Sequence, residues 1–194
     1  MNLHLSASPH AHATVSIGRT MSLVILALVP ATLFGLYQFG WPAIFLFSVT
    51  VGATVGVEAL SLIAAGRPVR VTLMDGSALL TGWLLAMTLP PWAPWWIGVV
   101  GGARAVLLGK QVFGGIGQNL FNPAMVARVT LLISFPLEMT RWLAPAMLTD
   151  HSLDLAQSLT LVFHGVLPAN IGWDAISSAT PLDEMRTRLD MNQM

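Results

Sequence analysis

Long runs of apolar residues, separated by short polar breaks, fill most of the chain between residues 21 and 108. A helix needs about 20 mostly apolar residues to cross the roughly 30 Å hydrocarbon core of a bilayer. Three segments meet this length plainly and a fourth is slightly shorter: residues 21–40, 41–65, 71–90 and 92–108. The pattern therefore predicts an all-α, polytopic transmembrane helical bundle.

A fifth apolar segment, residues 124–135, is too short to cross the bilayer unaided, since it covers only about 18 Å at 1.5 Å per residue. It can cross only if the glycine-rich stretch before it also enters the membrane. This gives about five spans and one discontinuous helix. Residues 155–167 are also too short to span, and we expect them to lie at the membrane interface or against protein.

Charged residues in the short loops predict the orientation of the spans. Lys and Arg in such loops remain on the cytoplasmic side. Arg19 precedes the first segment, Arg67 and Arg70 separate the second from the third, and Lys110 follows the fourth. The N-terminus is therefore expected in the cytoplasm, and the residues after 136 on the outer face.

Composition supports a membrane protein, because 55% of the residues are hydrophobic and only 9% are charged. Residues 1–136 hold six Lys or Arg against two Asp or Glu, whereas residues 137–194 hold three against seven. We expect three parts: a cytoplasmic tail (1–20), a transmembrane bundle (21–136) broken at 110–124, and an outer-face segment (137–194). Cysteine is absent, which excludes thiolate-held iron–sulfur clusters in this chain; no nucleic-acid partner is expected.

The break itself has the sequence KQVFGGIGQNLFNPA. A phosphate-binding P-loop would place its Lys after the glycines, but Lys110 precedes them. Asn122 and Pro123 predict a helix that begins at Pro123, since Asn is a favoured N-cap and Pro suits the first helical position. The positive end of such a helix dipole faces whatever lies before it, and Asn119 and Asn122 would flank that place. A ligand site and a packed seam between subunits both fit this arrangement.

Four ionisable residues lie inside or at the edges of the predicted spans, all toward the cytoplasmic side with Lys110: Glu58, Asp75, Arg104 and Arg128. Charges in a bilayer are unfavourable unless they are paired or hydrated. Mutual salt bridges are one interpretation. In the other, the charges form a polar entry for an ion, with Glu58 and Asp75 as candidate ion-path residues. Asp75, Gly76 and Ser77 also fit a local polar turn.

Three stretches together resemble the RnfD/NqrB family, the membrane subunits of the Rnf electron-transport complex and of the sodium-pumping NADH:quinone reductase. They are DGSALLTG at residues 75–82, the glycine-rich stretch at 109–124, and DAISSATPL at 174–182. Their order and spacing cover most of the chain. The resemblance implies that the chain corresponds to the N-terminal half of a larger repeat fold, which continues into further transmembrane helices.

The resemblance also implies two flavins. A flavin transferase would link FMN through its phosphate to the hydroxyl of Thr180. Asp174 and Ser177 match the attachment signature, and Ser178 stands where glycine is usual. A riboflavin would be held without a covalent bond by Asn119 and Asn122, which have the family's Asn-x-x-Asn spacing.

The function implied by the resemblance is electron transfer coupled to ion transport, in an ion-translocating NAD/ferredoxin oxidoreductase complex of the bacterial inner membrane. The chain would not be catalytic by itself. Its partners would be a second covalent-FMN subunit and iron–sulfur membrane subunits, with Thr180 on the periplasmic side. Two alternatives remain: a non-redox transporter or channel subunit, and an inactive truncated scaffold fragment.

Overall fold

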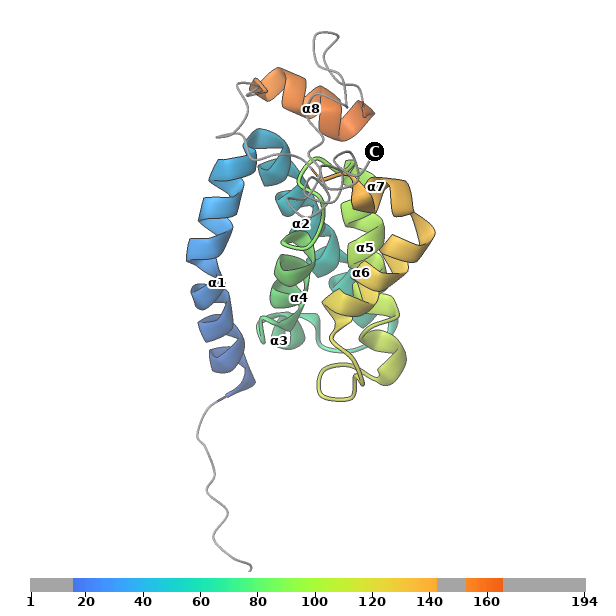
Figure 1. Ribbon diagram of the computed structural model, residues 1–194. Helices are drawn as coiled ribbons and strands as arrows, with labels where there is room; N and C mark the ends of the chain where they lie inside the picture. The colour runs from blue at the N-terminus through green and yellow to red at the C-terminus, as the bar shows by residue number, and fades with distance from the viewer. Residues whose placement is uncertain (1–15, 143–152, 166–194) are drawn as a thin grey trace, which may run out of the picture.

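The computed structural model describes residues 16–142 and 153–165. This part of the chain is all-α, as predicted, and its helices run in the following order (Figure 1). They are α1 (Ile17–Phe39), α2 (Trp41–Ala64), α3 (Val69–Leu73), α4 (Ser77–Ala86), α5 (Trp95–Leu107), the 3-10 turn η1 (Gln111–Phe113), α6 (Pro123–Ser134), α7 (Pro136–Thr140) and α8 (Leu155–His164).

Helix α2 is the centre of the bundle and packs against α4, α5 and α8. Its buried side chains recur at every fourth position, so that they form one stripe along the helix. The members of this stripe are Pro42, Leu46, Thr50, Thr54, Glu58 and Leu62. The hydroxyls of Thr50 and Thr54 donate hydrogen bonds to the carbonyls one turn earlier, both at 2.7 Å. The buried stripe therefore satisfies its hydroxyl groups within α2.

Glycines let α4 and α5 approach this stripe closely. A Cβ atom added at Gly82 would lie 3.0 Å from Thr54 Cβ, and one added at Gly102 would lie 2.7 Å from Thr54 Oγ1. Small residues at helix contacts are typical of membrane bundles, where close packing rather than the hydrophobic effect holds helices together. The contacts of α2 with α4 and α5 thus depend on the missing side chains.

Helix α1 stands at the side of the bundle with most of its surface free (Figure 1). Its contacts include a hydrogen bond from the Trp83 indole to Thr32 Oγ1 at 2.8 Å, and one from the Trp92 indole to the Phe39 carbonyl at 3.3 Å. Within the described residues, α1 and α2 are the helices long and apolar enough to cross a membrane individually. They agree with the first two predicted spans.

The prediction of one helix over residues 71–90 was wrong. Helix α3 ends at Leu73 and α4 begins at Ser77, because Gly76 adopts a left-handed conformation with φ of 77°. The Asp75 carboxylate accepts a hydrogen bond from the Ser77 N–H at 2.7 Å, which confirms the polar turn. Helix α4 has 10 residues and α5 has 13, so they extend about 15 and 20 Å, less than the bilayer core.

The predicted start of a helix at Pro123 is confirmed. The side chain of Asn122 accepts a hydrogen bond from the Ala124 N–H at 3.0 Å and so caps α6. The expectation of a short helix near residues 155–167 also holds, because α8 packs on α2 and its Phe163 ring lies 6.1 Å from that of Trp95. Helix α3 and the glycine-rich loop lie at one end of the bundle, and α7 and α8 at the other (Figure 1).

We expect Gly102→Ala to weaken the bundle, because the added methyl group collides with Thr54. Overpacking of this kind lowers the free energy of unfolding by about 1–3 kcal/mol. Gly56→Ala is the matched control, since a Cβ there would meet no atom within 4 Å. It should leave stability unchanged or raise it through better helix propensity. Unfolding of both variants in detergent measures the difference, and equal stability of the two would contradict this packing account.

Candidate functional site

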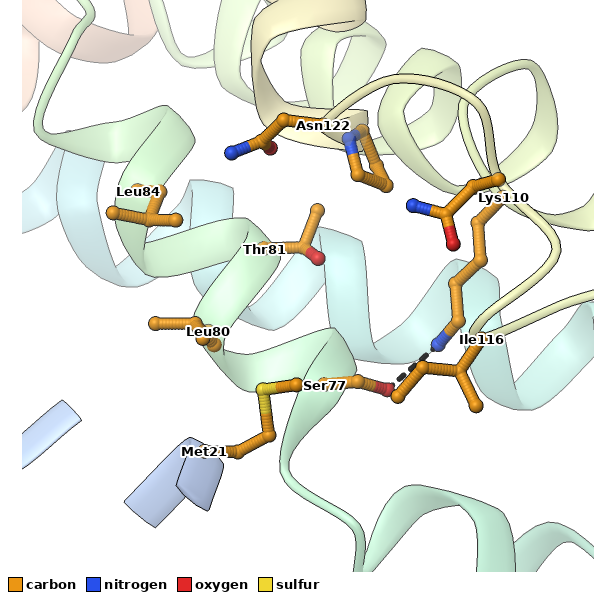
Figure 2. A pocket seen from close by; sticks show the side chains of 10 residues that line it. Met21, Ser77, Leu80, Thr81, Leu84, Lys110, Ile116 and Asn122 are labelled. Carbon is orange, nitrogen blue, oxygen red and sulfur yellow. Dashed lines mark hydrogen bonds between the residues drawn. The ribbon is translucent and has the colours of Figure 1, made fainter. Parts of the chain in front are cut away.

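A cavity of about 250 Å³ lies between α1, α4, the glycine-rich loop and the start of α6 (Figure 2). Its apolar lining consists of Met21, Leu80, Leu84, Ile116 and Pro123. Its polar lining consists of Ser77, Thr81, Lys110, Asn119 and Asn122. The helix break that the sequence indicated therefore borders a cavity within the described part of the chain.

Both asparagines of the Asn-x-x-Asn pair line this cavity. Each uses one amide atom within the loop: Asn122 Oδ1 caps α6, and Asn119 Nδ2 donates to the Phe121 carbonyl at 3.1 Å. In residues 16–142 and 153–165, Asn119 Oδ1 and Asn122 Nδ2 have no hydrogen-bond partner. The pair thus offers the cavity one acceptor and one donor group.

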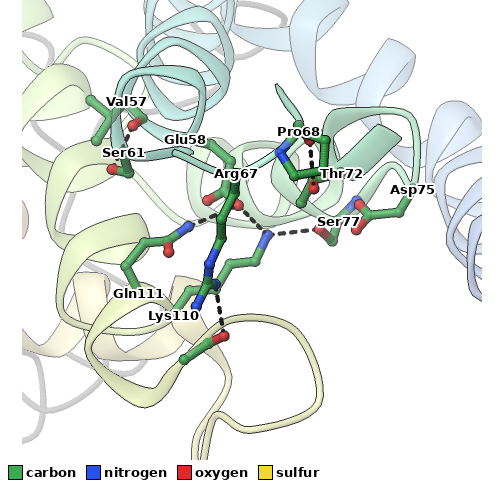
Figure 3. Close-up of polar contacts among 11 residues, drawn as sticks. Val57, Glu58, Ser61, Arg67, Pro68, Thr72, Asp75, Ser77, Lys110 and Gln111 are labelled. Carbon is green, nitrogen blue, oxygen red and sulfur yellow. Dashed lines mark hydrogen bonds and ion pairs between the residues drawn. The ribbon is translucent and has the colours of Figure 1, made fainter. Parts of the chain in front are cut away.

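A buried ion pair lies at the edge of the cavity (Figure 3). Lys110 Nζ lies 2.8 Å from Glu58 Oε1, and the two side chains are 4% and 1% exposed. The ammonium also donates to Ser77 Oγ at 2.8 Å, and Gln111 Nε2 donates to Glu58 Oε1 at 3.0 Å. Glu58 Oε2 is buried and has no hydrogen-bond partner among the described residues. These contacts fix the position of the Lys110 ammonium.

Three separate elements supply this cluster, which explains why the pairing was only partly visible in the sequence. Glu58 belongs to the buried stripe of α2, Lys110 follows α5, and Ser77 is the first residue of α4. A single charge buried this deeply would be strongly unfavourable, so the pair needs both partners. Neither Ser77 nor Gln111 was predicted to contact these charges, although Ser77 lies in the DGS stretch of the polar turn.

The glycine-rich loop is fastened to the bundle on two sides. Arg67 donates to the Gly114 carbonyl at 3.1 Å. At Gly109, an added Cβ would lie 2.7 Å from the Pro123 Cα, so the chain after α5 touches the start of α6. Gly114 and Gly115 have φ of 103° and 109°, conformations that favour glycine. The glycines therefore serve the path of the backbone around the cavity.

Arg104 and Arg128 do not join the ion pair, which corrects the prediction that the intramembrane charges gather in one place. Arg104 Nη1 donates to the Thr130 carbonyl and to Ser134 Oγ, both at 3.0 Å. Arg128 Nη1 donates to the Thr88 carbonyl beyond the end of α4. Carbonyls near the C-terminal end of a helix lack partners and attract cations. The arginines therefore stabilise the ends of two short helices.

Asp75 lies one contact away from the ion pair. Its carboxylate binds the Ser77 N–H, while the Ser77 hydroxyl accepts from Lys110. No salt bridge is formed by Asp75 with another described residue. Thr180, Asp174 and Ser177, the predicted residues of covalent flavin attachment, lie outside the described residues.

Apolar helices, glycine-mediated packing and a buried ion pair beside a cavity are features of a polytopic membrane protein with an internal binding site. Residues 4–194 match the NQR2, RnfD, RnfE family. The chain belongs to this family, which confirms the resemblance seen in the three sequence stretches.

The chain is similar over nearly its whole length to proteins whose names make them a subunit of an ion-translocating oxidoreductase complex. It is 54% identical to that of Halorhodospira halophila, over 97% of this chain and 52% of the relative. It is 49% identical to that of Rhodobacter capsulatus, over 94% and 50%, and 41% identical to that of Escherichia fergusonii, over 97% and 56%. The chain thus spans about half the length of the curated relatives it matches.

We expect Lys110→Met to destabilise the bundle because it leaves the Glu58 carboxylate buried without a cation. Breaking a buried pair on one side costs about 3–5 kcal/mol, whereas removing both charges costs much less. The double variant Glu58→Gln/Lys110→Met should therefore recover most of the loss in an unfolding titration. Arg70→Met, at an exposed position, is the control and should have no effect. Equal losses in the single and double variants would exclude a stabilising role of the pairing.

Proposed function

We propose that the chain is part of an RnfD-type membrane subunit of an ion-translocating oxidoreductase complex, in which it binds flavin and passes electrons. Its family membership and the names of its relatives support the complex. The observation that carries the flavin proposal is the cavity at the helix break, with Asn119 and Asn122 in its lining. Its cellular place would be the bacterial inner membrane, with the glycine-rich loop toward the cytoplasm.

The cavity suits an edge of the flat isoalloxazine ring of riboflavin. Its volume of about 250 Å³ is close to the lower end of the roughly 300–1,000 Å³ typical of small-molecule sites. Leu80, Leu84 and Ile116 provide apolar contacts for the ring faces. The free donor of Asn122 and the free acceptor of Asn119 match the carbonyl and N–H groups along one ring edge. Bound there, the flavin would supply the electron-accepting chemistry.

The second flavin of the proposal is FMN, joined through its phosphate to the hydroxyl of Thr180 by a flavin transferase. Asp174 and Ser177 belong to the same motif and would be recognised by the transferase. Electrons would pass between this chain, a second covalent-FMN subunit and iron–sulfur membrane subunits. This part of the proposal depends on the family motif, since Thr180 lies outside the described residues.

For the coupled ion, Glu58 and Asp75 are the proposed path residues. Each touches a residue that lines the cavity: Glu58 contacts Lys110, and Asp75 contacts Ser77. The partnerless Glu58 Oε2 is an available ligand for a cation or a proton. The same observation favours the second candidate function, a non-redox transporter or channel subunit. Solute uptake into liposomes by flavin-free protein would support that candidate instead.

Thr180→Ala should abolish the covalent flavin because it removes the hydroxyl that would form the phosphoester. The measurement is flavin fluorescence of the band in a denaturing gel, together with the intact mass of the chain produced with its transferase. Thr187→Ala, in the same segment, is the control and should keep the full FMN mass increment. Flavin that remains attached in Thr180→Ala would refute Thr180 as the attachment residue.

Asn122→Asp should lower non-covalent flavin binding because it replaces the free amide donor with a carboxylate oxygen while keeping an oxygen to cap α6. Loss of one buried hydrogen bond of this kind corresponds to a decrease of about tenfold in affinity. The measurement is extractable flavin in a Thr180→Ala background, where covalent FMN is absent. Gln118→Ala, at an exposed position outside the lining, is the control. Unchanged flavin content in Asn122→Asp would disprove the assigned contact.

A further inference from the structure

Two helices begin at the wall of the cavity. Ser77 is the first residue of α4 and Pro123 is the first residue of α6, and both line the cavity. The N-terminal end of a helix carries a partial positive charge from its unpaired N–H groups. The Asp75 carboxylate offsets part of this charge at α4, because it binds the Ser77 N–H. At α6, the cap is the neutral amide of Asn122.

The buried ion pair is oriented relative to the same cavity. Lys110 belongs to its lining and Glu58 does not, so the positive end of the pair is nearer to a bound ligand. The Lys110 ammonium has three hydrogens, and two of them are directed to Glu58 and Ser77. No described residue accepts the third. Figure 2 shows the ammonium beside Ser77 at the edge of the cavity.

These groups add to one another because they are held in place before a ligand arrives. A charge fixed in a partly desolvated site acts more strongly than one in water, and it needs no rearrangement when a ligand gains charge. Among the described contacts, Glu58 and Asp75 are the carboxylates nearest to the site, and each is separated from the cavity by a residue of the lining. The cavity therefore has a positive electrostatic potential.

We infer that Lys110 makes this cavity selective for a ligand that bears negative charge, and that it stabilises the reduced flavin relative to the oxidised one. Naming flavin as the ligand rests on the proposed function, whereas the positive potential does not. Each electron that reaches the ring without a proton adds one negative charge to it. The electron comes from a reduced flavin or iron–sulfur centre of a partner subunit, which is oxidised by one electron in the same step. Lys110 acts as a positioning residue with a charge.

The potential can be measured without any flavin, because the chain has no cysteine. Leu84→Cys places one thiol in the cavity lining, and Leu137→Cys places one on the exposed surface of α7 as a control. Both variants are prepared in membranes that contain the complete complex. Each is treated with an anionic (sulfonatoethyl) and a cationic (trimethylammonioethyl) methanethiosulfonate, and labelling of this chain is followed by mass. The anionic-to-cationic rate ratio should be higher at Leu84→Cys than at Leu137→Cys.

Changes at the ion pair should move this ratio in opposite directions. Glu58→Gln leaves Lys110 unbalanced and should raise the ratio at Leu84→Cys by about threefold or more, whereas Glu58→Gln/Lys110→Met should lower it by a similar factor. Altered packing would change the rates with both reagents alike. If the double variant does not assemble, the rise in Glu58→Gln remains as the test. An unchanged ratio in both variants, or a shift in the same direction, would overturn the inference.

The flavin part has its own readout, the midpoint potential of the non-covalent flavin in a Thr180→Ala background. Glu58→Gln/Lys110→Met should bind oxidised flavin as before but reduced flavin about tenfold more weakly, which lowers the potential. Glu58→Gln should raise it. Equal potentials in all variants would overturn the role of Lys110. Complete absence of flavin from the unaltered complex would overturn the flavin assignment, while the thiol ratios still decide the positive potential.

Discussion

The buried ion pair between Glu58 and Lys110 holds together the elements that form the cavity. It joins the central helix α2 to the chain that follows α5, and through Ser77 it reaches the start of α4. A carboxylate and an ammonium this deeply buried are tolerated only in contact with each other. The pair therefore requires that these three elements meet at one place. The cavity lies beside that place because Lys110 and Ser77 belong to both.

Short helices pose a second constraint, since they end where water is scarce and leave backbone groups unpaired. In this chain, α4 and α6 receive arginine side chains at or beyond their C-terminal ends, from Arg128 and Arg104 respectively. Their N-terminal ends are served by Asp75 and Asn122. Charged and polar residues within apolar sequence thus have structural roles at the helix ends. This leaves the ion pair as the charged group that also faces the cavity.

The glycines divide into two groups with different physical functions. Those of α4 and α5, such as Gly82 and Gly102, permit close contact with the stripe of α2. Those of the loop, such as Gly114 and Gly115, adopt positive φ and turn the chain around the cavity. One composition therefore supports both the rigid packing of the bundle and the irregular path of the break. A binding site formed by a fixed loop and fixed helices needs little rearrangement to accept a ligand.

Local sequence patterns were enough to predict the all-α class, the first two long helices, the cap at Asn122 with its helix start at Pro123, and the family. These features depend on apolar length, on a capping residue followed by proline, and on motifs in order. The interruption of residues 71–90, the pairing of Glu58 with Lys110, and the binding of carbonyls by Arg104 and Arg128 became visible in the folded chain. They depend on which elements meet in space, because a charge far away in the chain can reach a buried group that its sequence neighbours cannot.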